Sequence, residues 1–146
     1  MIVRFRFPSI LDVPAISAIR KEAFPMLETD ESKVMLKVLL YSGTSLVGVH
    51  NGRVISYCLG EMRGDSLHIM ELAVRRAYRG KGVGKLTLRT MEKLARKRGA
   101  KRITLEVAVS NEVALSLYEK EGYVKKNLLR GYYPWGEDAY LMVKVL

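Results

Sequence analysis

The stretch RGKGVGKLT, residues 79–87, decides how the rest of this chain is interpreted. It places three glycines among basic residues, which is typical of a turn that binds phosphate. The phosphate loop of ATPases and GTPases requires glycine, four residues, Gly-Lys and then serine or threonine. Anchored on Gly84-Lys85, that pattern puts Arg79 first and Leu86 last, so it fails at both ends. The dinucleotide pattern G-x-G-x-x-G also fails, because no register supplies its third glycine.

The sequence on either side of this stretch predicts a strand, a turn and a helix. Residues 66–74, SLHIMELAV, form a strand-like apolar run, and residues 83–98 repeat apolar side chains at helical spacing before Gly99 ends the helix. The N-terminus of a helix presents unpaired N–H groups and a partial positive charge. Arg79, Lys81 and Lys85 add charge there, so we expect a pyrophosphate site. The alternative is a glycine-rich turn whose basic residues only face solvent.

The remaining segments predict a mixed α/β layer with the order β-α-α-β-β-β-α-β-α-β-β. Asp12 and Asp30 are expected to cap two early helices, and Asn51-Gly52 is expected to turn a hairpin. The other expected elements are strands at residues 2–7, 102–109, 123–130 and 139–146 and a helix within residues 110–122. No linker, repeat or low-complexity tract interrupts them, so residues 1–146 are expected to form one domain.

Composition narrows the class of protein. About half of the 146 residues are apolar, which excludes a disordered chain. Cys58 is the only cysteine, so no intrachain disulfide forms and a cytoplasmic location is expected. Met1 leads directly into a strand-like run, and no apolar run approaches the roughly 18 residues of a membrane span. We therefore expect neither a signal peptide nor a membrane partner.

The net charge of +10 calls for an acidic partner or a solvated basic surface. Candidate partners are a nucleic acid, a phosphate-rich cofactor and an acidic substrate. The basic residues concentrate between Arg75 and Arg102, around the glycine stretch. That placement favours local anion binding over a uniform coat.

Three ordered motifs resemble the GNAT-fold acetyltransferases. The first is the Arg/Gln-x-x-Gly-x-Gly/Ala signature, at Arg79, Gly82 and Gly84. The second, Asn-x-x-Ala-x-x-Leu-Tyr-x-x-x-Gly-Phe/Tyr, is similar to that of RimI and the N-terminal protein acetyltransferases. It matches at Asn111, Ala114, Leu117, Tyr118, Gly122 and Tyr123. The third resembles the Tyr-Tyr…Gly-Glu-Asp-Ala segment of N-terminal acetyltransferases and matches at Tyr132, Tyr133, Gly136, Glu137, Asp138 and Ala139.

The resemblance covers the chain from about Phe5 to its end and implies a GNAT fold. That fold has a central mixed sheet with splayed strands, flanked by about four helices. Its implied cofactor is acetyl-CoA, with no metal. The pyrophosphate would bind the backbone of Arg79, Gly80, Lys81, Gly82, Val83, Gly84 and Lys85. The strand residues Leu72, Ala73 and Val74 would pair with the pantetheine arm, and Asn111 would hydrogen-bond that arm or simply cap its helix.

Acetyl transfer to an amine needs a base for the ammonium, and three candidates remain open. Glu106 leads, because it lies in the middle of a strand where burial would raise its pKa, and RimI-like enzymes resemble this sequence there. His68 is the rival, and water alone is the third possibility. Glu71 is a weaker candidate beside the proposed cofactor strand. The carbonyl oxygen is expected to rest on a backbone N–H near Leu72.

The leaving thiolate needs an acid, and Tyr118 is the candidate. A phenol can donate a proton to sulfur, and the resemblance implies that role for the matching tyrosine. Without the resemblance, a core tyrosine is the better interpretation of the residue.

The substrate side resembles that of N-terminal acetyltransferases. Phe24, Pro25 and Met26 would form an apolar wall that suits methionine or a small apolar residue as the first residue, with Glu28 within reach of the amine. Tyr132 and Tyr133 would cover the peptide backbone. Met26 stands where relatives that prefer acidic termini carry glutamate, and Pro134-Trp135 departs from the Asp or Thr-Asp of many relatives. Without the resemblance, these segments are loops that close over a core.

The implied function is transfer of acetyl from acetyl-CoA to protein or peptide N-termini by direct attack in a ternary complex. A ribosomal protein is one possible substrate, and a monomer or weak homodimer is expected. The alternatives are another amine acceptor, such as a lysine side chain, polyamine or small molecule, or a basic nucleic-acid-binding module. Tyr78 is the only aromatic residue between Arg75 and Arg102, so base stacking lacks partners and nucleic acid is not expected.

Overall fold

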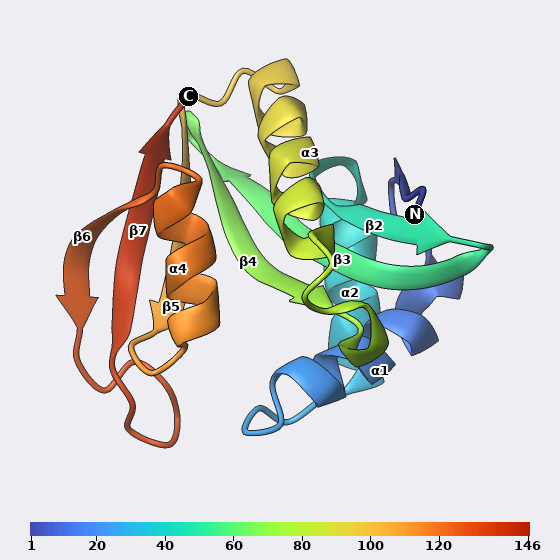
Figure 1. Cartoon of the computed structure of the whole chain (residues 1–146), viewed down its shortest axis with the longest axis horizontal. Coiled ribbons are helices and arrows are strands. Elements are labelled where there is room, and N and C mark those ends of the chain that lie inside the picture. Colours follow the sequence, from blue (N-terminus) through green and yellow to red (C-terminus); the bar gives the residue numbers. More distant parts are fainter.

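The fold is built on a seven-stranded sheet, and the computed structural model describes it with all of residues 1–146 (Figure 1). The strand order across the sheet is β1-β2-β3-β4-β5-β7-β6. Every neighbouring pair is antiparallel except β4 and β5, which run parallel. The strands are β1 (Arg4–Arg6), β2 (Leu46–His50), β3 (Arg53–Arg63), β4 (Ser66–Val74), β5 (Arg102–Ala108), β6 (Val124–Leu129) and β7 (Ala139–Val145).

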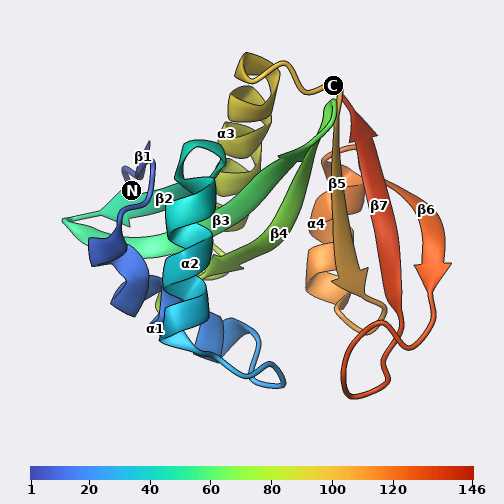
Figure 2. The same cartoon turned by 180° about the vertical axis from the view of Figure 1, so that it is seen from behind.

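Four α-helices cover the two faces of the sheet. Helices α1 (Val13–Ala23) and α2 (Glu31–Tyr41) lie on one face, as Figure 2 shows from behind. Helices α3 (Val83–Lys97) and α4 (Glu112–Lys120) lie on the other, with α4 in front of β5 and β7 (Figure 1). Short 3-10 turns occupy Ile10–Asp12, Ser42–Thr44 and Arg76–Tyr78. None of the helices combines the length and the apolar character that a membrane span requires.

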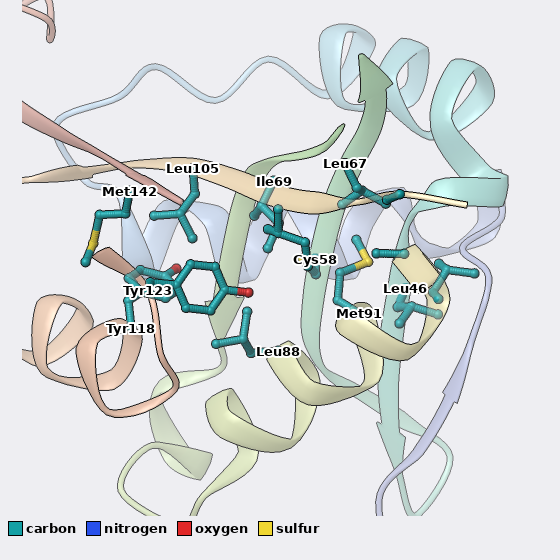
Figure 3. Packing of buried hydrophobic residues seen from close by; sticks show 14 of the residues in the cluster. Leu46, Cys58, Leu67, Ile69, Leu88, Met91, Leu105, Tyr118, Tyr123 and Met142 are labelled. Atoms are coloured by element: carbon teal, nitrogen blue, oxygen red, sulfur yellow. The ribbon is translucent and has the colours of Figure 1, made fainter. Parts of the chain in front are cut away.

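Each face of the sheet has its own hydrophobic core. On the α3 and α4 face, Leu88 and Met91 of α3 pack against strand residues such as Leu105 (Figure 3). The edge-to-face pair Tyr118 and Tyr123 extends this core toward α4, with ring centroids 5.6 Å apart. The other core joins α1 and α2 to β2, β3 and β4. Burial on both faces holds the central strands in place between the helices.

The sheet opens between its two parallel strands. β4 and β5 pair only from Ser66 to Ile69 and from Arg102 to Leu105, respectively. Beyond those residues the two strands diverge, as both views show (Figures 1 and 2). The β5-facing edge of β4 therefore has free backbone groups from Met70 to Val74. The expected mixed sheet with splayed strands is confirmed.

Most of the expected local features are confirmed, including the element order. Asn51 and Gly52 both have positive φ, at 48° and 73°, as a tight two-residue hairpin turn requires. Asp30 caps α2 by accepting a hydrogen bond from the Ser32 N–H at 2.9 Å. The expected capping of α1 by Asp12 is wrong: the carboxylate instead forms an ion pair with Arg6 at 2.7 Å, accepts from the Ser9 N–H at 2.8 Å in the preceding 3-10 turn, and makes no cap bond to α1. The two guanidinium N–H groups of Arg6 bind the Asp12 carboxylate more strongly than the backbone N–H groups of α1 would.

Candidate active site

A cavity of about 660 Å³ lies where β4 and β5 diverge. Its wall is mostly apolar, with a few polar side chains set into it. Such a lining is typical of a small-molecule site. The lining comes from four places in the chain: Ala23–Leu27 after α1, Ile69–Leu72 of β4, Leu105–Ala108 of β5 with Ser110, Asn111, Ala114 and Tyr118, and Tyr132–Trp135 before β7.

The glycine stretch lies between β4 and α3. Gly80 and Gly82 have φ of 74° and 81°, where residues with side chains are strained, and nothing lies within 4 Å of a Cβ at either position. The N–H groups of residues 80–85 donate no hydrogen bond within the chain. Arg79 is fixed by its Nε, which donates to the Val74 carbonyl at 3.0 Å. This turn offers a row of free backbone donors on a positively charged helix end, as an anion site needs.

Glu106 faces the cavity, and His68 stands behind it. The His68 Nε2 lies 2.7 Å from Glu106 Oε2, and its Nδ1 lies 2.6 Å from Thr104 Oγ1. Because an ionised carboxylate can only accept, Nε2 carries the proton toward Glu106. His68 is 5% exposed and does not line the cavity. Both of its ring nitrogens are occupied by protein groups, Nε2 by Glu106 and Nδ1 by Thr104. Glu106 Oε1 accepts a further hydrogen bond from the Tyr132 hydroxyl at 3.1 Å.

The expected direction of the Glu106 pKa is wrong. Burial acts to raise this pKa, but the hydrogen bond and charge of His68, the Tyr132 hydroxyl and the charge of Arg63 together lower it by more. The pKa of Glu106 therefore lies below its ordinary value, and the side chain is ionised throughout the neutral range. The sequence showed the burial of this strand position but not the donors that other elements bring to it.

Tyr118 lines the opposite part of the cavity. Its side chain is 7% exposed, and its hydroxyl has no hydrogen-bond partner in the chain. Burial, with smaller contributions from Cys58 and Tyr133, raises the pKa of Tyr118 well above the ordinary tyrosine value. The hydroxyl therefore stays protonated and has a proton to donate into the cavity. Asn111 lines the same wall and caps α4, with its Oδ1 accepting from the Ala114 N–H at 3.2 Å.

The segment before β7 forms an aromatic wall that is tied down at its base. Tyr132 and Tyr133 meet edge to face, and Tyr133 stacks on Trp135 with ring centroids 4.8 Å apart. Glu137 accepts from the Trp135 indole N–H and from the Ser110 backbone N–H, both at 3.1 Å. Asp138 accepts from the Gly131 N–H at 2.8 Å. The Gly-Glu-Asp segment thus fixes this wall against the turn that precedes α4.

The loop after α1 forms the facing wall. Phe24, Pro25 and Met26 line the cavity, whereas Glu28 does not; the Glu28 backbone carbonyl accepts from Arg20 Nη1 at 2.6 Å.

Glu71 of β4 also lines the cavity, but both of its oxygens are occupied. Arg20 Nε lies 3.0 Å and 3.1 Å from them, the Tyr57 hydroxyl donates to Oε1 at 2.8 Å, and Lys37 Nζ lies 3.5 Å from Oε2. Glu71 is therefore held by three side chains, from α1, α2 and β3, and ties these elements to β4.

The structure brings together most of the residues that the sequence selected. On the cavity wall are Glu106, Tyr118, Asn111, Leu72, Phe24, Pro25, Met26, Tyr132 and Tyr133. Ala73 is buried in the α1 and α2 core, and Val74 with residues 79–85 lies beyond the cavity toward α3. Sequence reasoning missed Arg20 and Trp135 as parts of the site. A charged residue on an amphipathic helix resembles a solvated one, so no signal marked Arg20.

The comparisons with known proteins agree with this arrangement. Residues 13–123 match the model of the acetyltransferase (GNAT) family. An uncharacterized N-acetyltransferase of Methanocaldococcus jannaschii is 38% identical over 145 residues, which cover 99% of this chain and 91% of the relative. The ribosomal protein bS18-alanine N-acetyltransferase of Escherichia coli K12 is 31% identical over 137 residues, 90% of this chain and 89% of the relative.

A solved structure shows the same fold across the whole chain. Ard1 from Thermoplasma volcanium superposes with a TM-score of 0.95 at 22% sequence identity, covering 100% of this chain and 99% of that one. At this identity the likeness extends to the fold alone.

Proposed function

The chain belongs to the acetyltransferase (GNAT) family and is an acetyl-CoA-dependent N-acetyltransferase, and we propose that it acetylates the α-amino group of protein and peptide N-termini. The observation that carries this proposal is Glu106, which is backed by His68 and faces a cavity closed by an apolar wall and an aromatic wall. The relative that acts on a ribosomal protein supports a protein acceptor. We place the enzyme in the cytoplasm, since its single cysteine is buried and unpaired.

The residues present fit acetyl-CoA. The turn from Arg79 to Lys85 holds free N–H groups and basic side chains that suit a pyrophosphate. The free edge of β4 near Leu72 offers backbone groups to an amide-containing arm, and the Asn111 side chain lies beside that edge on the cavity wall. Acetyl-CoA supplies an acetyl group activated as a thioester, which an amine attacks directly.

Glu106 would act as the proton acceptor. Because its pKa is held low, the carboxylate is ionised when the peptide arrives as an ammonium. It can hold that ammonium and accept one of its protons, which frees the lone pair with which nitrogen then bonds to carbon. His68 keeps the carboxylate oriented through Nε2, and Thr104 in turn fixes the ring. We therefore assign His68 as a positioning residue rather than as the base.

Tyr118 would act as the acid. Its raised pKa keeps the phenol protonated, and its hydroxyl is free of protein partners. It would donate a proton to the sulfur as the bond between carbon and sulfur breaks. The second proton that the nitrogen loses would then restore the phenol. A backbone N–H of β4 near Leu72 would stabilise the charge on the carbonyl oxygen. The proton acceptor on β5 and the proton donor on α4 thus line the same cavity.

The test of this proposal is thiol release from acetyl-CoA with a panel of peptides. The peptides begin with methionine, serine, alanine, glutamate or glycine, and each is used with a free and with a blocked α-amine beside an internal lysine. We expect turnover only with free α-amines and a preference for methionine, because Phe24, Pro25 and Met26 form an apolar wall. Turnover that survives blocking would assign a lysine acceptor instead.

Arg20 is expected to position the substrate loop. Its guanidinium joins Glu71 of β4 to the Glu28 carbonyl and to Thr29 Oγ1, the latter at 3.0 Å. Arg20→Gln should raise the KM for the peptide by about tenfold, with little change in kcat or in the KM for acetyl-CoA, because the loop loses a charged anchor. Arg20→Lys should rescue only part of the loss, since lysine lacks the planar fork. Steady-state kinetics with each substrate varied in turn provide the measurement.

The matched control is Arg6→Gln, which removes a comparable two-bond pair with Asp12, at 2.7 and 2.9 Å, away from the cavity. Both variants should lose thermal stability, but only Arg20→Gln should change the peptide KM. Equal KM values in the two variants would show that Arg20 has only a structural role.

A further inference from the structure

A second hollow, separate from the active site, lies between α3, the end of α4 and β7. It measures about 540 Å³ and contains no apolar residue in its wall. The wall consists of five cations, two carboxylates and one glycine: Arg89, Lys93, Arg96, Lys120, Lys144, Glu92, Glu121 and Gly122. A concave surface with a surplus of positive charge attracts anions.

The two carboxylates in the hollow do not neutralise the surplus. Glu92 is 4% exposed and is already bound by the Tyr123 hydroxyl at 2.8 Å and by Lys144 Nζ at 3.1 Å. Glu121 is paired with Arg89 at 2.6 Å. Lys93, Arg96 and Lys120 have no carboxylate within 4.0 Å. Three cations therefore surround the hollow without a partner from the chain.

The positive charge continues beyond the hollow along α3. Arg89, Lys93 and Lys97 follow one another at intervals of four residues, and all are exposed. A helix rises 1.5 Å per residue, so this row is roughly 12 Å long. The only acidic residue of α3 is Glu92, which is buried, so the exposed side of the helix carries no negative charge.

We propose that this basic face, formed by the hollow and the α3 row, binds the phosphate backbone of a nucleic acid. The cations lie along α3, at the end of α4 and on β7, and this spread over three elements favours an extended polyanion over a single phosphate group. The lack of aromatic side chains argues against base stacking, but contacts with backbone phosphates need only Lys and Arg. A planar lipid surface would not enter a hollow, and Leu86 is the only large apolar side chain exposed on α3. The sequence-based expectation that nucleic acid is no partner considered stacking alone.

The test is a fluorescence-anisotropy titration of a labelled RNA duplex over a range of salt concentrations. The triple variant Lys93→Gln, Arg96→Gln, Lys120→Gln leaves the acetyl-CoA turn and the cavity unaltered. We expect it to weaken binding and to reduce the slope of log K against log salt by about 3, close to one for each removed phosphate contact. Its peptide acetylation and its affinity for acetyl-CoA should be unchanged.

The matched control is Arg4→Gln, Lys33→Gln, Arg53→Gln, which removes the same charge from exposed positions outside this face. It should bind the duplex like the unaltered protein. Equal weakening by both triples would overturn the proposal, because net charge alone would then explain the binding. A weakened affinity for acetyl-CoA in the first triple would assign the hollow to the cofactor instead. If the first triple loses binding to anionic vesicles but still binds the duplex, the hollow is a membrane-binding site. The acetyl-CoA result and the vesicle result would each overturn the proposal.

Discussion

Replacing Tyr118 with phenylalanine is expected to lower kcat by about 10²-fold or more, the usual contribution of a general acid. The phenol is a protonated group on the cavity wall that has no protein partner, and phenylalanine preserves its shape while removing the proton. The KM for acetyl-CoA should stay within about twofold, since the ring still fills the wall. The rate of thiol release at saturating concentrations of both substrates measures kcat directly.

The control for this variant is a neighbouring tyrosine. Tyr123 packs edge to face on Tyr118, but its hydroxyl donates to Glu92 at 2.8 Å and does not reach the cavity (Figure 3). Tyr123→Phe should lower stability by about 2 kcal/mol, the net value of a hydrogen bond to a charged group, and leave kcat unchanged. Similar kcat values for Tyr118→Phe and the unaltered enzyme would remove Tyr118 from the chemistry and leave it as a core residue.

Replacing Glu106 with glutamine is expected to change how activity depends on pH. An α-ammonium has a pKa near ~8, so without a base the reactive neutral amine becomes tenfold scarcer for each pH unit below that value. The variant should follow this decline and lose about 10²-fold in kcat/KM at pH 6. The unaltered enzyme should stay level down to acidic pH, because the pKa of Glu106 lies below its ordinary value and the carboxylate remains ionised.

The two pH profiles should converge above pH 8, and that convergence is the internal control for a folded, substrate-binding variant. A glutamine variant that is equally impaired at every pH would contradict proton acceptance by Glu106. A variant that matches the unaltered enzyme throughout would leave water as the acceptor. His68→Asn should show a weaker form of the same pH dependence, because His68 acts only through Glu106.

The glycine stretch illustrates what local sequence can establish. A strand, a turn with obligatory positive φ and an amphipathic helix are all encoded within residues 66–99, so that unit was predictable without any distant contact. The same holds for the Asn51-Gly52 hairpin. Asp12 shows the limit, because Arg6 takes the carboxylate that the helix pattern alone assigns to a cap.

The site shows the same limit at the level of chemistry. Glu71 and Glu106 are both strand glutamates that line the cavity, and only the tertiary structure shows that one meets Arg20 and Lys37 of two helices while the other meets His68 of β4. In the parallel pairing of β4 and β5, His68 lies opposite Thr104. Thr104 precedes Glu106 by two residues on β5, so both side chains are on the same face of that strand. The electrostatic partners that set the pKa of Glu106 therefore come from residues distant in sequence.

The most direct test of the central claim is to locate the acetyl group by mass spectrometry on one peptide that offers two amines. The peptide begins with methionine, has a free α-amine and carries one internal lysine, and it is incubated with the enzyme and acetyl-CoA. We expect a single added acetyl group, carried only by fragments that contain the N-terminal residue. An acetyl group on the lysine, or none on either amine while a small amine is acetylated, would contradict the claim that this enzyme acts on N-termini.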